Sequence, residues 1–285
     1  MTLSNRSQRR RAWLAATWVL FVGAAGGYLS ASPAPDKKKP QYHPPPPRTL
    51  PEKVERLASQ LLSVPLDESD PITGQIQQLV VGHLQDWFAT QTSASTPRDV
   101  PYDVQIRREM EKAFSELQYP LYGQCVVFSQ SWKGALLTGA SYTLGWSDYD
   151  RANVVALFET RDGKTRLAGI DHFVPHTDLH YAFLPSPDPA SFRFLVYGTR
   201  LGKSQPRLSA ILYGYDGQTL KSLWQARDFY DGKLEVENDS VVIRYLKEEE
   251  YVREQVHNRK PPRHLATYKT SPQGLTLASD QEIPF

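Results

Sequence analysis

Histidines and aspartates gather in one short stretch of the sequence. His172, His176 and His180 are three of the seven histidines, and Asp171 and Asp178 lie among them. In an extended chain alternate side chains share one face, which places His176, Asp178 and His180 together. Two imidazoles and a carboxylate with an open fourth position form a zinc or iron site of the catalytic type. Pro175 indicates a loop, so a hydrogen-bonded surface loop is the interpretation that the pattern favours, and the metal site is the alternative. The predicted metal ligands are His172, His176, Asp178 and His180.

Other catalytic motifs are absent from the sequence. It contains no His-Glu-x-x-His, paired Cys-x-x-Cys, Gly-x-Ser-x-Gly, complete EF-hand loop or glycine-rich phosphate loop. Cys125, the single cysteine, lies in Cys-Val-Val-Phe, which is typical of a buried and unreactive thiol. The sequence therefore favours a protein without enzymatic activity over an enzyme. A divalent metal at the histidine cluster is the one cofactor considered.

Aromatic residues recur beside polar residues through the second half of the chain. Such rings stack on sugars or contact a peptide where they lie on an exposed sheet face, and they fill the core where alternation turns them inward. The rings concerned are Trp132, Trp146, Tyr149, Tyr181, Tyr213, Tyr215, Trp224, Phe229 and Tyr230. This pattern makes a carbohydrate-binding module one alternative function.

An uncharged and mostly apolar run extends from Ala12 to Leu29. As a helix, its eighteen residues would be about 27 Å long, close to the bilayer's hydrocarbon thickness of about 30 Å. The run is longer than the apolar core of most cleaved signal peptides, and the residues after it fit a cleavage site poorly. Residues 12–31 are therefore predicted to be a transmembrane anchor, with a cleaved signal segment as the alternative.

The distribution of charge sets the expected topology. Residues 1–50 hold eight Lys or Arg and one acid, a net charge of +7, and the other 25 basic and 30 acidic residues give −5. Four arginines precede the apolar run, so the positive-inside rule places residues 1–11 in the cytoplasm as a basic tail and the bulk of the chain outside. Because the remainder of the chain is acidic overall, no nucleic-acid partner is expected.

A proline-rich linker, residues 32–51, follows the apolar run and contains eight prolines. This density removes amide donors and fixes φ, which predicts an extended polyproline II spacer. Residues 52–120 form the predicted helical segment, where apolar stripes with helical spacing begin near residues 54, 72 and 106. These amphipathic helices are expected to pack on the sheet that follows.

In residues 121–285 the hydrophobic pattern has a period of two and is rich in β-branched and aromatic residues, which predicts a mainly β domain. The expected strands are 124–132, 135–144, 152–160, 165–173, 179–184, 192–199, 207–214, 219–226, 233–237, 240–246, 264–269 and 275–279. Asp-Gly pairs that begin at residues 162, 216 and 231 are hairpin signals. Strands joined by such turns form an antiparallel meander, and a sandwich, a barrel and propeller-like sheets all fit. The charged residues 247–262 are expected to add a short exposed helix.

Together these features predict a single-pass, membrane-anchored, extracytoplasmic protein whose β-rich domain binds or scaffolds an unknown ligand. Its expected partners are the membrane, through the N-terminal helix, and an envelope protein or glycan. The alternative functions are a metal-dependent hydrolase that uses the cluster from His172 to His180 and a carbohydrate-binding module. If the N-terminal segment is cleaved, the domain is secreted instead.

Overall fold

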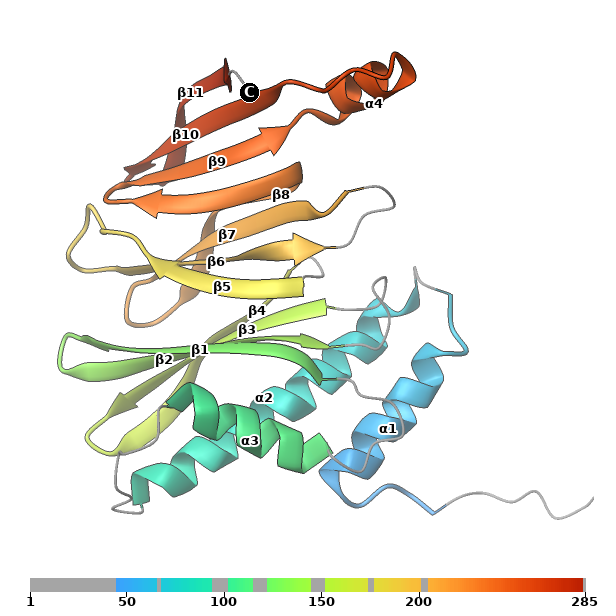
Figure 1. The fold of residues 1–285 in the computed structure, drawn as a ribbon. Helices are drawn as coiled ribbons and strands as arrows, with labels where there is room; N and C mark the ends of the chain where they lie inside the picture. The colour runs from blue at the N-terminus through green and yellow to red at the C-terminus, as the bar shows by residue number, and fades with distance from the viewer. Residues whose placement is uncertain are drawn as a thin grey trace, which may run out of the picture. The chain divides into compact units, whose positions relative to one another are not determined.

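Two antiparallel sheets and four helices make up the described part of the chain (Figure 1). The computed structural model describes residues 45–65, 68–93, 102–114, 122–144, 152–173, 177–200 and 205–283. Three helices precede the sheets, and a short fourth helix lies between two strands of the second sheet. The helices are α1 (Leu50–Leu61), α2 (Asp70–Ser93), α3 (Tyr102–Phe114) and α4 (Glu248–Val256). The fold class is mainly β, as predicted.

Helix α1 begins where the proline-rich linker ends. Thr49 is its N-cap: Thr49 Oγ1 accepts the Glu52 N–H at 3.3 Å, and Glu52 Oε2 accepts the Thr49 N–H at 3.0 Å. This capping box pairs amide donors that the first helical turn leaves free, and Pro51 is tolerated there because it lacks such a donor. Val54 and Ala58 on the same helix are buried, so α1 is fixed by its cap and by its packing.

The strands follow one another as an antiparallel meander. The first sheet has the order β1-β2-β3-β4 and the second has the order β11-β10-β9-β8-β7-β6-β5. The strands are β1 (Tyr122–Trp132), β2 (Ala135–Leu144), β3 (Ala152–Arg161), β4 (Lys164–Phe173), β5 (Thr177–Phe183), β6 (Phe192–Arg200), β7 (Arg207–Tyr215), β8 (Leu220–Glu237), β9 (Ser240–Leu246), β10 (Arg263–Ser271) and β11 (Gly274–Ile283). Each predicted strand falls on an observed one. In the described part of the chain neither sheet closes on itself, so the barrel alternative is wrong.

One of the predicted hairpins is wrong, because its two strands form the single strand β8. The sequence predicts two strands here with a turn at the third Asp-Gly pair, but β8 is continuous. Its first part pairs with β7 and its last part with β9, and the register shifts between Tyr230 and Lys233. A Cβ atom on Gly232 would lie 2.7 Å from Leu208 Cβ of β7. Glycine therefore permits a close approach of β7 at this bend.

Three clusters of buried side chains join the layers. The first packs the helices, with Ile76 and Ile106, against Phe158 on one face of the first sheet. The second packs the opposite face of that sheet, with Leu157, against Phe194 and its neighbours in the second sheet. The third lies within the second sheet, where side chains of β6 and β7 pack against those of β9 and β11. The N-terminal helices thus pack on the first sheet, as predicted.

The predicted transmembrane anchor, residues 12–31, lies outside the described residues, as does the basic tail. Among the helices that are described, none is long and apolar enough to cross a membrane. Residues Pro46–Phe285 form one compact unit. The described helices and both sheets therefore belong to the same unit.

Candidate functional site

The predicted metal ligands fall on strands of two different sheets. His172 lies on β4 in the first sheet, whereas Asp178 and His180 lie on β5 in the second. All three side chains are exposed, and His180 Nε2 forms a 3.0 Å hydrogen bond with Asp178 Oδ1. His176 lies outside the described residues. The structure therefore brings two of the four predicted ligands into contact.

The backbone near this pair is not a regular strand. Asp178 has a φ of 57°, in the left-handed region, and the pairing of β5 with β6 shifts register between Thr177 and His180. Within the described ranges, no group of three or more His, Cys, Asp or Glu side chains is arranged to hold a metal ion. A metal at this cluster remains a prediction.

The predicted aromatic residues divide between the core and a half-buried set. The buried rings are Tyr213, Tyr215 and Tyr230. The half-buried rings are Trp132, Tyr181, Trp224 and Phe229, while Trp146 and Tyr149 lie outside the described residues. Trp132 and Tyr215 have ring centroids 5.6 Å apart. The half-buried Trp132 therefore lies beside the buried Tyr215, and the hydroxyl of Tyr215 belongs to a cluster of polar side chains.

The centre of that cluster is a buried glutamate between the two sheets. Glu159, near the end of β3, is 4% exposed. Val155 and Leu157 of the same strand pack against the second sheet, and alternate strand residues share a face. Strand alternation therefore directs the Glu159 carboxylate toward the same interface. A carboxylate in such a place must be hydrogen-bonded or ion-paired to stay charged.

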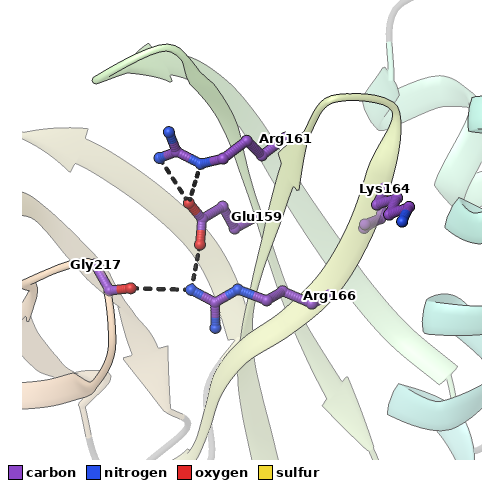
Figure 2. A pocket seen from close by; sticks show the side chains of 6 residues that line it. Glu159, Arg161, Lys164, Arg166 and Gly217 are labelled. Atoms are coloured by element: carbon purple, nitrogen blue, oxygen red, sulfur yellow. Dashed lines mark hydrogen bonds and ion pairs between the residues drawn. The ribbon is translucent and has the colours of Figure 1, made fainter.

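Two arginines flank this carboxylate (Figure 2). Arg161 Nε and Nη2 donate to Glu159 Oε1 at 3.4 and 3.1 Å, and Arg166 Nη2 donates to Glu159 Oε2. Arg166 Nη2 also donates at 2.9 Å to the carbonyl oxygen of Gly217, which lies between β7 and β8. The ion-paired groups therefore tie the β3–β4 hairpin of the first sheet to a turn of the second.

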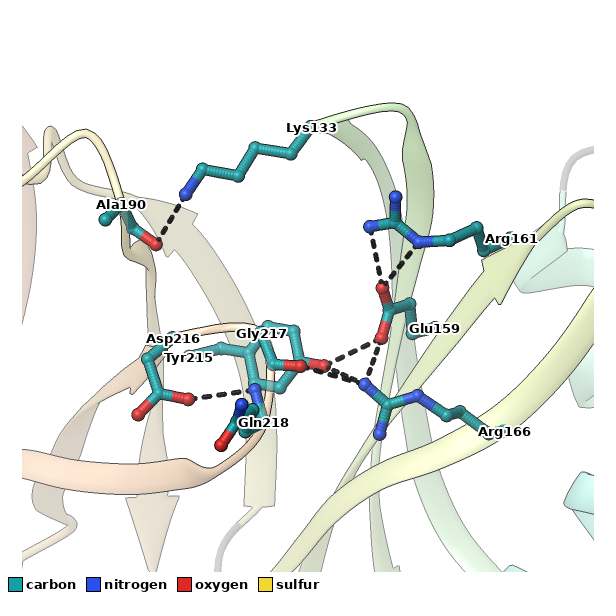
Figure 3. Close-up of polar contacts among 9 residues, drawn as sticks. All are labelled: Lys133, Glu159, Arg161, Arg166, Ala190, Tyr215, Asp216, Gly217 and Gln218. Carbon is teal, nitrogen blue, oxygen red and sulfur yellow. Dashed lines mark hydrogen bonds and ion pairs between the residues drawn. The ribbon is translucent and has the colours of Figure 1, made fainter.

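Tyr215 completes the cluster from the second sheet (Figure 3). Its hydroxyl donates to Glu159 Oε2 at 2.8 Å and accepts from Arg166 Nη2 at 2.7 Å. Burial by itself raises the pKa of Glu159, but hydrogen bonds from Tyr215 and Arg161 and the charge of Arg166 hold that pKa below its ordinary value. Burial, with the hydrogen bond to the Glu159 carboxylate, raises the pKa of Tyr215 to about 12. At neutral pH the cluster therefore contains a carboxylate and a neutral phenol.

An open hollow of about 500 Å³ lies at this cluster, and we call it the basic hollow. Its lining residues are Glu159, Arg161, Lys164, Thr165, Arg166 and Gly217. The side chains of Arg161 and Arg166 are 50% and 51% exposed. Figure 2 shows Lys164 apart from the ion-paired groups, and its Nζ has no hydrogen-bonding or ion-pair partner among the described residues. Three cations and one carboxylate give the lining a net charge of +2.

No motif in the sequence marks this site. Its hairpin carries Phe-Glu-Thr-Arg-Asp-Gly-Lys-Thr-Arg, which has the composition of an ordinary exposed turn. The signal that could have found it is strand alternation. Glu159 follows Val155 and Leu157 at every second position, so its side chain is expected on the same inward face of the strand. Its partner Tyr215 lies 56 positions further along the chain, and no local pattern links the two.

Comparison with known proteins identifies no family for this chain. No family model matches it, and no curated protein matches it. One similar solved structure is the α-L-arabinofuranosidase Arb93A from Fusarium graminearum in complex with an iminosugar inhibitor. The TM-score is 0.32 at 10% sequence identity, and the match covers 58% of this chain and 50% of that one. The matched part thus spans half of that protein, and a likeness of this extent transfers neither fold nor activity.

Proposed function

We propose that this chain is a membrane-anchored, extracytoplasmic binding protein whose basic hollow binds an anionic ligand. The observation that supports the proposal is the charge of the lining, in which Arg161, Lys164 and Arg166 outnumber the single carboxylate. A ligand carboxylate, phosphate or sulfate group would bring the hollow closer to neutrality. Guanidinium groups suit such ligands because their planar donors match the oxygen atoms of these anions.

Glu159 acts in this proposal as a positioning residue. Its carboxylate accepts hydrogen bonds from Arg161, Arg166 and Tyr215, and its lowered pKa leaves it without a proton to donate at neutral pH. Arg161 Nη1 and Arg166 Nη1 make no hydrogen bond within the described chain, and both side chains are half exposed. The cluster is therefore better suited to holding an anion than to acid catalysis.

We infer that the sheets are arranged as propeller-like blades. The bend in β8 divides the second sheet into β5–β8 and β8–β11, which pack against each other through the third buried cluster. With β1–β4, this gives three four-stranded antiparallel units that pack in series (Figure 1). Serial stacking of this kind is typical of propeller blades. The basic hollow lies at the hairpin turns of the first two units.

The proposed topology is tested by protease treatment of intact cells that express the full chain. We expect an external protease to digest the domain, because the basic tail stays inside and the proline-rich linker places the domain outside. A short N-terminal fragment that contains residues 12–31 should remain protected in the membrane. Immunoblotting of both ends measures this. Digestion that occurs only after the cytoplasmic side is exposed would contradict the orientation.

Anion binding is tested by thermal unfolding of the full-length protein in detergent. At a sulfate concentration ten times the dissociation constant, binding is expected to add about 1.4 kcal/mol of stability. Lys164→Gln removes one cation from the lining, so this gain should shrink. The control is Lys269→Gln, which removes the same charge from an exposed position on β10.

The control is needed because sulfate also stabilises proteins by exclusion from their surfaces. Stabilisation by exclusion is the same for both variants. A difference between their sulfate-dependent gains in stability therefore measures sulfate binding at the basic hollow. Chloride at matched ionic strength gives the baseline for each. An equal response to sulfate in Lys164→Gln and Lys269→Gln would contradict the proposal.

A further inference from the structure

A second hollow, of about 360 Å³, lies between β1 of the first sheet and β5 and β6 of the second, and we call it the aromatic hollow. Three of its lining residues are aromatic and four carry hydroxyl or amide groups. They are Trp132, Phe183, Phe192, Gln130, Ser131, Ser186 and Ser191. Hollows of about 300 to 1,000 Å³ that combine rings with a few polar groups are the usual form of small-ligand sites.

The rings of the aromatic hollow are held from behind by the core. Phe183 is 38% exposed, and its ring meets Phe128 edge-on with the centroids 5.3 Å apart. Phe192 lies 5.7 Å from Phe183 and 6.5 Å from Trp132 by the same measure. Rings that are already fixed lose little conformational freedom when a ligand binds. The hollow is therefore preorganised.

Positive charge also reaches the aromatic hollow. Arg193 lines it and is 4% exposed. Its Nη1 and Nη2 donate to the carbonyl oxygens of Ser271 and Pro272 at 2.7 and 2.6 Å. Both acceptors are neutral, so the charge of this guanidinium is not cancelled by them. The nearby Asp188 carboxylate offsets part of this charge, so the preference for an acidic ligand comes mainly from the basic hollow.

The aromatic hollow and the basic hollow are neighbours. Trp132 lines the first and Gly217 lines the second. A Cβ atom on Gly217 would lie 3.6 Å from Trp132 Cη2, so the indole ring and the β7–β8 turn are neighbours. Figure 3 shows Lys133 donating at 3.1 Å to the carbonyl oxygen of Ala190, beside the Glu159 cluster. One ligand of a few sugar units could therefore contact both hollows.

We infer that the ligand is an acidic saccharide, and this inference rests on the proposed function above. Its carboxylate or sulfate ester binds among Arg161, Lys164 and Arg166, and a neighbouring sugar ring lies against Trp132 and Phe183. The C–H face of a sugar packs on aromatic rings, and its hydroxyls pair with serine and glutamine side chains. A small anion would leave the rings uncovered, and a neutral sugar would leave the basic hollow unfilled.

Calorimetric titration of the full-length protein in detergent with trigalacturonate, maltotriose and sulfate tests this inference. Trigalacturonate should bind at least about tenfold more tightly than either of the others, because it alone uses both hollows. Phe183→Leu should weaken trigalacturonate binding about fivefold and leave sulfate binding unchanged. Lys164→Gln should weaken both. Phe229→Leu, the same change on β8 away from both hollows, should alter neither.

Gln130→Ala is a second variant of the aromatic hollow, because this exposed side chain can be removed with little risk to folding. Gln130→Ala should also weaken the binding of trigalacturonate and leave the binding of sulfate unchanged. Unchanged trigalacturonate affinity in Phe183→Leu and Gln130→Ala, with a loss in Lys164→Gln, would overturn the saccharide inference and leave the proposed function standing. Unchanged affinity for both acidic ligands in Lys164→Gln would overturn both. Trigalacturonate that binds no more tightly than sulfate would overturn the sugar-ring site.

Discussion

Replacing Gly139 by alanine is expected to lower the free energy of unfolding by about 3 kcal/mol, the upper part of the range for overpacked cores. Gly139 on β2 lies directly opposite Phe128 on β1. An added Cβ would lie 2.1 Å from Phe128 Cε1 and 2.3 Å from Cζ. The Phe128 ring is 4% exposed and packs against Tyr181 and Phe194, with centroids 5.1 and 5.0 Å away, so it has little room to move. The change therefore strains the cluster that joins the two sheets.

The matched control for this prediction is Gly74→Ala. Gly74 lies in helix α2, and a Cβ there would have no neighbour within 4 Å. Alanine costs less than glycine in a helix, so this variant should gain about 1 kcal/mol. Urea unfolding of both variants gives the comparison. Equal stability of Gly139→Ala and the parent chain would show that the packing between the sheets is not as described.

Glu159→Gln is expected to lower the free energy of unfolding at neutral pH by about 2 kcal/mol. Loss of one partner from a buried ion pair costs about 3–5 kcal/mol. Here Arg161 and Arg166 are half exposed and water can solvate them, so the smaller value applies. The control is Glu235→Gln, because Glu235 is 54% exposed and 3.8 Å from Arg244 and should contribute little.

The cost of Glu159→Gln should depend on pH in a definite direction. The pKa of Glu159 is below its ordinary value of 4.5, so on acidification the unfolded chain takes up this proton before the folded chain does. The stabilisation is therefore complete above pH 4.5 and is lost as the pH falls through the lowered pKa. Urea unfolding from about pH 8 to about pH 3 measures it. A difference between parent and variant that stays constant or grows below pH 4.5 would contradict the assignment.

Local turn chemistry makes much of the sheet predictable from the sequence. Asp162 and Gly163 have φ values of 51° and 73°, and Gly217 has a φ of 95°, as expected for hairpin turns. The Asp-Gly pair that includes Gly232 is different, because its environment is set by a contact with Leu208 on a neighbouring strand. A residue pattern alone does not distinguish a turn from a bend that tertiary packing requires.

The candidate site depends on contacts between the two sheets, and no local sequence pattern predicts these contacts. Alternation indicates that Glu159 points inward, but it does not show that Tyr215 and the Gly217 carbonyl lie opposite. The opposite case is the histidine stretch. It is dense in sequence, yet the structure places His172 in one sheet and His180 in the other. Closeness along the chain is therefore a poor guide to closeness across sheets.

Arginine side-chain NMR tests most directly whether the basic hollow binds an anion. Full-length, 15N-labelled protein in detergent is titrated with sulfate, and the Nε–H signals are assigned by substitution. We predict saturable shifts of Arg161 and Arg166 with one dissociation constant, and no comparable shift of Arg244, whose side chain is 52% exposed on β9. Shifts as large at Arg244 as at Arg161 and Arg166, or no shift at these two, would contradict this prediction.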